Sequence, residues 1–307
     1  MILLWGLEQD APLARVRAEL TRLRVPTLFL DQRETLECEV EVEFGPRISG
    51  RVVSPGGRAR VEEVRGLYLR PYNFRNFPEF AGLGPGSDEW SHATTFEDIM
   101  WSWAEMAEAR VLNRPSAMAS NNSKPYQSQL IRECGFSVPQ TLITTTAGRA
   151  RRFSRRRGGA IYKSISGTRS IVSRVGADKM EALADVAWCP TQFQSLVEGV
   201  DYRVHVVGKR LFACRIRSDA VDYRYASGSQ VEPCELPGDV AARCLALSER
   251  LGLELSGIDL RETPGGEWFC FEVNPSPAFS CFECRPEQTI SAGIARYLAE
   301  AVGARVN

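Results

Sequence analysis

Three oxygen-bearing side chains near the C-terminus have the types and the spacing of a metal site. Asp259 lies in one apolar run, a Pro-Gly-Gly turn follows, and Glu272 and Asn274 lie in the next apolar run. If the two runs pair as antiparallel strands, Glu272 and Asn274 share a face and Asp259 can lie opposite them. Two carboxylates and an amide oxygen suit Mg²⁺, which completes its shell with nucleotide phosphates. The alternative is a hairpin whose polar residues face water, although the apolar neighbours favour a buried one.

A second candidate site is a lysine beside a turn of small residues. Lys163 lies at the end of a predicted strand, directly before residues 164–168, which are mostly hydroxyl-bearing and include one glycine. The N–H groups of such a turn, beside a fixed positive charge, can enclose phosphates. Only four of the 38 basic residues are lysines, which favours a site that needs a compact ammonium. Hairpins without a ligand share this composition, so both interpretations stay open.

A third candidate is the extended segment 191–208. It ends a predicted strand at Glu198-Gly199 and then places Asp201 and Arg203 two residues apart, on one face of the next strand. Backbone amides there can meet the edge of a base, and the polar groups can meet a ribose. The alternative is a β-hairpin with an exposed acid and an exposed base.

The order of these residues along the chain resembles the ATP-grasp superfamily. The motif Glu272-Val-Asn-Pro-Ser-Pro277 resembles its RimK-like branch, and Val221-Asp-Tyr-Arg224 resembles the corresponding segment of graspetide (microviridin-type) peptide ligases. The resemblance covers about residues 110 to 300. It rests on motifs that follow one another in the same order: Lys124, Lys163, 194–203, Asp259 and Glu272-x-Asn274.

The resemblance implies a nucleotide held between two small α+β lobes. Lys124 and Lys163 would contact the α- and β-phosphates, under a lid that includes Ser166, Gly167 and Thr168. The adenine would meet a hinge formed by Gln194, Ser195, Leu196 and Val197. The ribose would meet Glu198 or Asp201. The lid has one glycine where many grasp enzymes have several, which puts its closing geometry in question.

The resemblance also implies the metal ligands and the catalytic cations. Asp259, Glu272 and Asn274 would bind Mg²⁺. The arginines that would stabilise the transferring phosphoryl group are Arg203, Arg217 and Arg224. The cofactors are then ATP and Mg²⁺.

The chemistry implied is the activation of a carboxylate. A substrate carboxylate attacks the γ-phosphate, and an amine or a hydroxyl captures the acyl phosphate. This needs no protein nucleophile, and the two histidines, His92 and His205, form no Ser-His pair. The substrate expected is a peptide or an amino acid, modified as in graspetide maturation or added to a protein tail as by RimK-like enzymes. The alternatives are a nucleotide-binding regulatory module without ligase activity and an ATP-grasp kinase, although the kinase lacks an obvious base.

The predicted elements place these residues in an α/β (α+β) protein, with the ATP-grasp fold behind an N-terminal Rossmann-like pre-grasp domain. At the N-terminus, residues 2–5 and 25–30 predict strands around a helix over 12–23, which is a β-α-β start. Strands or hairpins are expected within 38–69, a long loop over 71–86, and a helix over 91–109 with Phe96, Ile99, Met100, Trp103 and Met106 on its apolar side. We expect loop 71–86 to contribute to peptide binding, so that deleting it weakens peptide affinity more than ATP affinity.

Strands and helices are also expected through the rest of the chain. Strands are predicted at 141–146, 159–172 with a turn, 191–197, 203–207, 210–217, 256–260 and 268–273. Helices are predicted from about 124 to 134, over 239–251 and over 288–302, with a basic surface run at 149–157. The predicted domains are 1–115, 116–190 for the central lobe with the lid, and 191–307 for the lobe with the metal site.

The composition sets limits on the class of protein. The 307 residues hold 38 Lys+Arg and 38 Asp+Glu, with 44% hydrophobic and 25% charged residues. This excludes a disordered chain and an electrostatically driven nucleic-acid binder. No apolar run approaches the roughly 20 residues of a membrane helix, so we expect no membrane partner and a cytoplasmic location. The nine cysteines predict reduced thiols, Cys281 and Cys284 included. The oligomeric state stays open, a homo-oligomer included.

Overall fold

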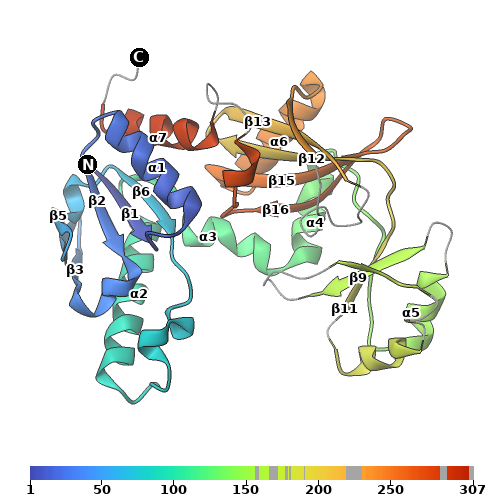
Figure 1. The fold of residues 1–307 in the computed structure, drawn as a ribbon, viewed down its shortest axis with the longest axis horizontal. Coiled ribbons are helices and arrows are strands. Elements are labelled where there is room, and N and C mark those ends of the chain that lie inside the picture. Colours follow the sequence, from blue (N-terminus) through green and yellow to red (C-terminus); the bar gives the residue numbers. More distant parts are fainter. Residues whose placement is uncertain are drawn as a thin grey trace. The chain divides into compact units, whose positions relative to one another are not determined.

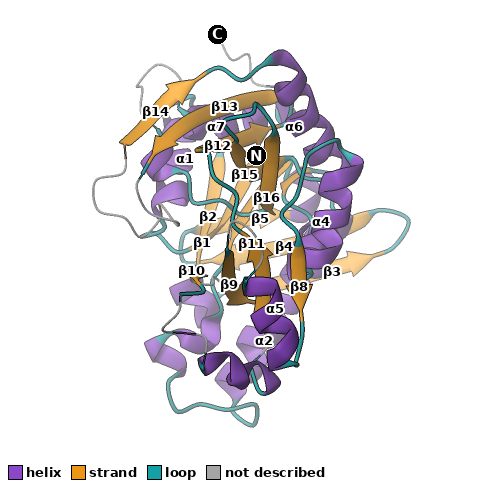
Figure 2. Ribbon diagram, turned by 90° about the vertical axis from the view of Figure 1, so that its right-hand side faces the viewer, coloured by secondary structure: helices purple, strands orange, loops and turns teal. Residues whose placement is uncertain are grey.

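A computed structural model describes residues 1–155, 159–165, 172–176, 179, 181–189, 191–218, 230–283 and 289–303. The chain forms two compact units that both mix helices and strands (Figure 1, Figure 2). Unit 1 contains Met1–Ala117, Leu253–Leu255 and Ala278–Asn307, and unit 2 contains Met118–Gly252 and Ser256–Pro277. The three predicted domains stay a prediction. No helix among the described residues is long and apolar enough to cross a membrane.

Unit 1 is built on a parallel four-stranded sheet in the order β2-β1-β6-β7. These strands are β1 (Ile2–Gly6), β2 (Thr27–Asp31), β6 (Gly66–Arg70) and β7 (Arg110–Leu112). Helix α1 (Ala11–Arg22) joins β1 to β2, which confirms the predicted β-α-β start. The helix begins there because the Asp10 carboxylate accepts a hydrogen bond from the Leu13 N–H. Helix α7 (Ile290–Ala301) packs against α1 and β6 (Figure 1).

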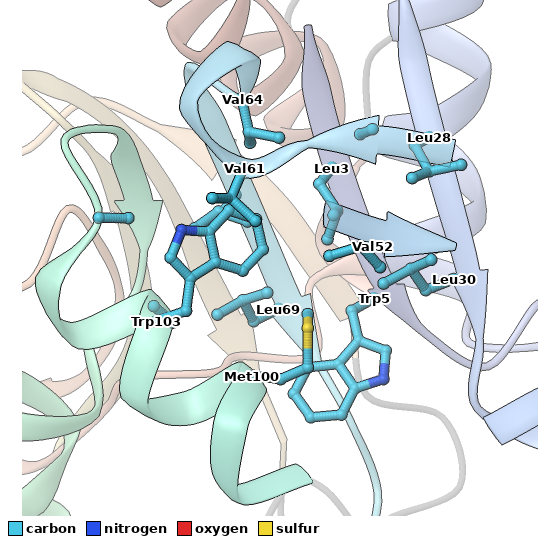
Figure 3. Packing of buried hydrophobic residues seen from close by; sticks show 14 of the residues in the cluster. Leu3, Trp5, Leu28, Leu30, Val52, Val61, Val64, Leu69, Met100 and Trp103 are labelled. Atoms are coloured by element: carbon cyan, nitrogen blue, oxygen red, sulfur yellow. The ribbon is translucent and has the colours of Figure 1, made fainter. Parts of the chain in front are cut away.

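The core of unit 1 lies between this sheet, helix α2 and a small antiparallel sheet. The small sheet contains β3 (Glu39–Phe44), β4 (Ile48–Ser54) and β5 (Gly57–Arg60), which confirms the strands expected within 38–69. Figure 3 shows Trp5 of β1 beside Met100 and Trp103 of α2 (Asp88–Met106), all of them buried. Met106 is 50% exposed, so its expected place on the apolar side is wrong, because the helix ends at this residue.

The predicted loop 71–86 is partly structured. It contains two short 3₁₀ turns, at Phe74–Asn76 and Pro78–Phe80. The rings of Phe74 and Phe80 are buried and pack at right angles, with centroids 4.9 Å apart. This segment therefore has an aromatic core of its own.

Unit 2 contains two antiparallel sheets. The smaller has the order β10-β9-β11-β8, with β8 (Thr141–Ile143), β9 (Ala160–Ser164), β10 (Ser173–Arg174) and β11 (Thr191–Ser195). Helix α5 (Ala147–Ser154) covers one face, where Phe153 and Phe193 are buried. The strand expected over 141–146 ends at Ile143. The basic run at 149–157 is helical as far as Ser154, and residues 156–158 lie outside the described residues.

The larger sheet of unit 2 has the order β14-β13-β12-β15-β16. Its strands are β12 (Val200–Val207), β13 (Arg210–Arg217), β14 (Gln230–Cys234), β15 (Leu255–Glu262) and β16 (Trp268–Asn274). Helices α4 (Lys124–Glu133) and α6 (Gly238–Arg250) pack against it, α4 on β16 and α6 on β12. The short helix α3 (Pro115–Met118) precedes α4. The β15–β16 hairpin is the one predicted to carry the metal ligands.

Candidate active site

A pocket in unit 2 is lined by residues of both sheets. The smaller sheet contributes Ile161 and Lys163, the larger one contributes Leu260 and Phe271, and the connection from β11 to β12 forms part of the wall. Eight of the residues predicted from the sequence line this pocket: Lys163, Gln194, Ser195, Leu196, Val197, Asp201, Asp259 and Glu272. Residues up to about 110 positions apart in the sequence therefore meet in one place.

The two candidate metal carboxylates lie opposite each other in the β15–β16 hairpin. Asp259 is the cross-strand partner of Glu272, and the pairing register shifts directly after Asp259. Both are half-buried, whereas Ile258 and Val273 beside them are fully buried. Asn274 follows on the same strand, and its side-chain oxygen accepts a hydrogen bond from the Ser276 N–H. This set of donors, two carboxylates and an amide oxygen, fits Mg²⁺. No third acid, histidine or cysteine joins them among the described residues.

Each of these carboxylates also has a cationic partner from the chain. The Lys124 Nζ lies 2.8 Å from Glu272 Oε1, and the Arg203 Nη1 lies 2.6 Å from Asp259 Oδ1. Both cations are buried, with side chains 9% and 7% exposed. Lys124, predicted to contact phosphate, thus lies at the candidate metal carboxylates, as does Arg203. These are charge-assisted hydrogen bonds in a partly desolvated place, where they are stronger than on a surface.

A glycine makes room for Arg203. Gly257 is the cross-strand partner of Asn274, and a Cβ at this position would lie 2.3 Å from Arg203 Nη2. It would also lie 2.7 Å from the Cβ of Pro277. The guanidinium therefore lies over Gly257 on its way to Asp259. Sequence reasoning named Gly257 only as part of a motif and missed this role.

Arg261 hydrogen-bonds both to the predicted hinge, residues 194–197, and to the ribose candidate Asp201. Its guanidinium donates two hydrogen bonds to Asp201, of 2.7 and 2.8 Å, and a third of 2.7 Å to the Val197 carbonyl oxygen. The Arg261 guanidinium also lies over the Phe271 ring. Of the two ribose candidates, Asp201 lines the pocket, whereas Glu198 is exposed and does not line it. Arg261 was missed, because no local pattern in the sequence distinguishes it from the other arginines.

Two glutamines lie near Lys163, and one of them, Gln194, lines the pocket. Lys163 is buried and lies opposite Gln192 in the β9–β11 pair. Gln194 donates a hydrogen bond of 3.2 Å to the Thr141 hydroxyl. Gln192 is 1% exposed, and its side-chain oxygen has no hydrogen-bond partner within the described part of the chain. Gln192 was also missed.

His205 lies behind Arg203. It is fully buried on the same strand, and its Nε2 accepts a hydrogen bond of 3.4 Å from the Arg203 Nε. Burial, and then the charge of Arg203, hold the pKa of the imidazole well below its usual range, so the ring is neutral. His205 is thus a packed residue of the core.

The remaining predicted residues do not line the pocket or cannot be placed. Arg217 ends β13, 59% exposed and 3.8 Å from Glu232. Four predicted residues lie outside the described residues: Ser166, Gly167, Thr168 and Arg224. Asn274 lies in the hairpin but not in the wall of the pocket. The roles of all these residues stay predictions.

The eight described cysteines are free thiols. Burial, with the nearby acids Glu34, Glu37 and Asp31, raises the pKa of Cys38 to about 12, and burial raises that of Cys244 to about 12. These thiols are therefore protonated at neutral pH and are poor nucleophiles. Cys281 is exposed, and Cys284 lies outside the described residues.

No model of a protein family and no curated protein matches this sequence, whereas solved structures match nearly all of it. The macrocyclase MdnC of Microcystis aeruginosa MRC, bound with the precursor peptide MdnA, is 21% identical over 97% of this chain and 99% of that chain, with a TM-score of 0.81. A RiPP-associated ATP-grasp ligase of Chryseobacterium gregarium, in complex with ADP and a leader and core peptide, is 21% identical over 100% and 98%, with a TM-score of 0.83.

The ATP-grasp ligase PsnB, complexed with a minimal precursor, is 26% identical over 98% of both chains, with a TM-score of 0.78. PsnB has also been solved with Mg and ADP. These similarities extend through unit 1, for which the sequence resembled only a general α/β unit. They confirm the resemblance to ATP-grasp ligases of the graspetide branch and the predicted fold class. The chain has the ATP-grasp fold.

Proposed function

We propose that this protein is an ATP-dependent ligase that joins a carboxylate to an amine or a hydroxyl on a peptide substrate. The observation that carries the proposal is the opposed pair Asp259 and Glu272, flanked by Lys124 and Arg203, at the wall of a pocket that also contains Lys163. A site with two acids and three cations suits catalysis by positioning and charge stabilisation.

The pocket offers a separate partner to each part of ATP. The backbone of Ser195 to Val197 offers hydrogen-bonding groups to the adenine edge. Asp201 and Lys163 both line the pocket, and we assign Asp201 to the ribose and Lys163 to the phosphates. Asp259, Glu272 and Asn274 would hold Mg²⁺, which supplies charge neutralisation for the phosphates when bound.

The proposed reaction has two steps. An oxygen of the substrate carboxylate attacks the γ-phosphorus, the bond to the β-phosphate oxygen breaks, and ADP leaves with that electron pair. An amine or a hydroxyl then attacks the acyl carbon, phosphate leaves, and the nucleophile's proton passes to phosphate or water. The chain's cations stabilise the negative charge on the transferring oxygens.

A peptide is the substrate that the similar structures favour. Structures of MdnC, the Chryseobacterium gregarium ligase and PsnB each contain a precursor peptide or parts of one. They match this chain over almost their whole length, and no large segment of them is missing here. We therefore place a ribosomally made precursor peptide ahead of a free amino acid.

The test is Mg²⁺-dependent release of ADP from purified protein, measured against a panel of acidic peptides and amino acids. We expect one class of peptide to stimulate release and to lose one water per bond formed, as seen by mass spectrometry. Glu272→Gln and Lys163→Ala should abolish both signals. Tight ATP binding without stimulated release by any peptide would instead favour a regulatory module.

A further inference from the structure

Four charged groups at the candidate metal site form two ion pairs. Lys124 with Glu272 and Arg203 with Asp259 bring together two carboxylates and two cations, so these groups have no net formal charge. The carboxylates are only 24% and 20% exposed. Two facing acids in such a place would repel each other without compensation, and the two cations supply it.

These ion pairs compete with a divalent cation for the same oxygens. A metal ion that enters alone meets carboxylates already bound to an ammonium and a guanidinium, and it adds two positive charges to a balanced cluster. A nucleotide changes this, because its phosphates are new anionic partners for Lys124 and Arg203.

We propose that Lys124 and Arg203 are exchangeable counter-ions, which hold the metal carboxylates in the nucleotide-free protein and move to the phosphates when the divalent cation enters with the nucleotide. The proposal rests on the proposed function, because it takes Asp259 and Glu272 as metal ligands. Its consequence is that the metal ion and the nucleotide favour each other's binding. Such coupling is reciprocal.

The position of Lys124 favours an exchange of partners. Lys124 is the first residue of α4, at the positive end of the helix dipole, where a cation is disfavoured. Glu272 compensates for this in the nucleotide-free protein, and phosphates would compensate for it as well. The lysine stem is flexible enough to move its ammonium between them.

The position of Arg203 depends on the absence of a side chain at residue 257. A methyl group there would overlap Arg203 Nη2, at the end of a long side chain, and would also lie 2.7 Å from the Pro277 Cβ. Gly257→Ala should therefore displace the guanidinium from Asp259 without changing the charge of the site. This gives a second way to break the same ion pair.

The experiment measures Mn²⁺ binding to nucleotide-free protein by the loss of the free Mn²⁺ signal in electron paramagnetic resonance. Lys124→Gln and Arg203→Gln should each bind Mn²⁺ about five- to tenfold more tightly than wild type, because each removes a cation that competes with Mn²⁺ for a carboxylate. Gly257→Ala should shift affinity in the same direction. Thermal unfolding establishes first that each variant is folded; if Arg203→Gln is not, Gly257→Ala and Lys124→Gln decide.

Arg261→Gln is the matched control. It removes a cation that lines the same pocket and leaves the Asp201 carboxylate without this partner, but it contacts neither metal carboxylate. It should leave Mn²⁺ affinity within about twofold of wild type, since an ion pair that does not include a metal carboxylate has a weaker electrostatic effect on bound Mn²⁺. If Arg261→Gln tightens binding as much as Arg203→Gln, general pocket charge explains the result and the exchange is refuted. Unchanged Mn²⁺ affinity in the three test variants refutes it too.

Two further measurements separate this inference from the proposed function. Asp259→Asn should weaken Mn²⁺ binding in the presence of ADP; if it does not, the metal site is misassigned, and the inference and the proposed site both fail. If the test variants bind Mn²⁺ more tightly while no peptide stimulates ADP release, the exchange stands and the ligase activity is refuted.

Discussion

At the residue scale, Arg261 connects the hinge to the ribose candidate. Its three hydrogen bonds hold Val197 and Asp201 in one arrangement. Arg261→Lys keeps the charge but cannot make the same set of bonds. The variant loses about one hydrogen bond, which contributes some 1–1.5 kcal/mol. We therefore expect the KM for ATP to rise about tenfold, with kcat changed less than about twofold. Steady-state kinetics at varied ATP would check this, and a fall in kcat at unchanged KM would contradict it.

His205 predicts how stability depends on pH. Its pKa in the folded protein lies well below the usual 6.5, so the unfolded chain takes up the proton first as the pH falls. The contribution of the neutral His205 to the free energy of unfolding is therefore complete above about pH 6.5. Below that pH the free energy of unfolding falls by up to about 1.4 kcal/mol per pH unit on account of this group. His205→Asn should remove this part of the slope, whatever its effect on stability at pH 8.

Urea denaturation at pH 8, 7, 6 and 5 measures that slope. His92→Asn is the control, because it removes the only other histidine, whose Nε2 contacts the Thr35 and Cys38 carbonyl oxygens at an exposed place. The difference between the two variants isolates the part of the slope that comes from the buried position of His205. Equal slopes for wild type and His205→Asn would show that the acid sensitivity comes from other groups.

The types of the site residues were predictable, but most of their partners were not. Asp259 and Glu272 could be placed opposite each other because strand periodicity and a short turn fix their register. The pairing of Lys124 with Glu272 joins residues 148 positions apart, and no local pattern encodes it. Arg261 could not be selected among so many arginines, since its role comes from the neighbouring hinge.

At the scale of elements, one glutamine fixes helix α4 to strand β16. The Gln127 amide donates to the Val273 carbonyl oxygen and accepts from the Val273 N–H, both at 2.9 Å. The Gln127 side chain is 2% exposed. It makes the kind of hydrogen bonds to the backbone of β16 that a further strand would make at this edge of the sheet. The helix therefore lies where its first residue, Lys124, reaches Glu272.

Gln127→Ala should destabilise the protein by about 2–4 kcal/mol, because it leaves two buried backbone groups without partners. Gln129→Ala is the matched control, since Gln129 is exposed on the same helix, and it should change stability by less than about 0.5 kcal/mol. Urea denaturation at pH 8 compares them. Similar losses for both variants would show that the two hydrogen bonds to β16 do not set the effect.

Element types were predicted better than element ends. Asp10 and Pro12 mark the start of α1 in the sequence and do begin it, since the carboxylate caps the first turn. The apolar pattern of α2 continued to Met106, but the helix ends there and this side chain is exposed. A periodic pattern does not show where packing stops.

At the scale of the whole molecule, the chain returns to its first unit at its end. Ala278–Asn307 belongs to unit 1, and α7 contributes the buried Ile294 and Leu298 to it. Gly66 of β6 has no side chain where Leu298 packs, since a Cβ there would lie 3.1 Å from Leu298 Cδ2. Domains predicted as continuous stretches of sequence cannot include such a return. The composition of the chain does not change at Pro277, so no compositional boundary marks it.

This arrangement predicts that the two units respond separately to core substitutions. Leu298→Ala in α7 should cost about 2–5 kcal/mol, and so should Leu247→Ala in α6, because both side chains are fully buried. In hydrogen exchange, Leu298→Ala should accelerate the amides of β1 and β6 and leave β12 and β15 near wild type, whereas Leu247→Ala should do the reverse. If either variant accelerates amide exchange equally in all four strands, the two units unfold as one, and the C-terminal helix stabilises unit 2 as well.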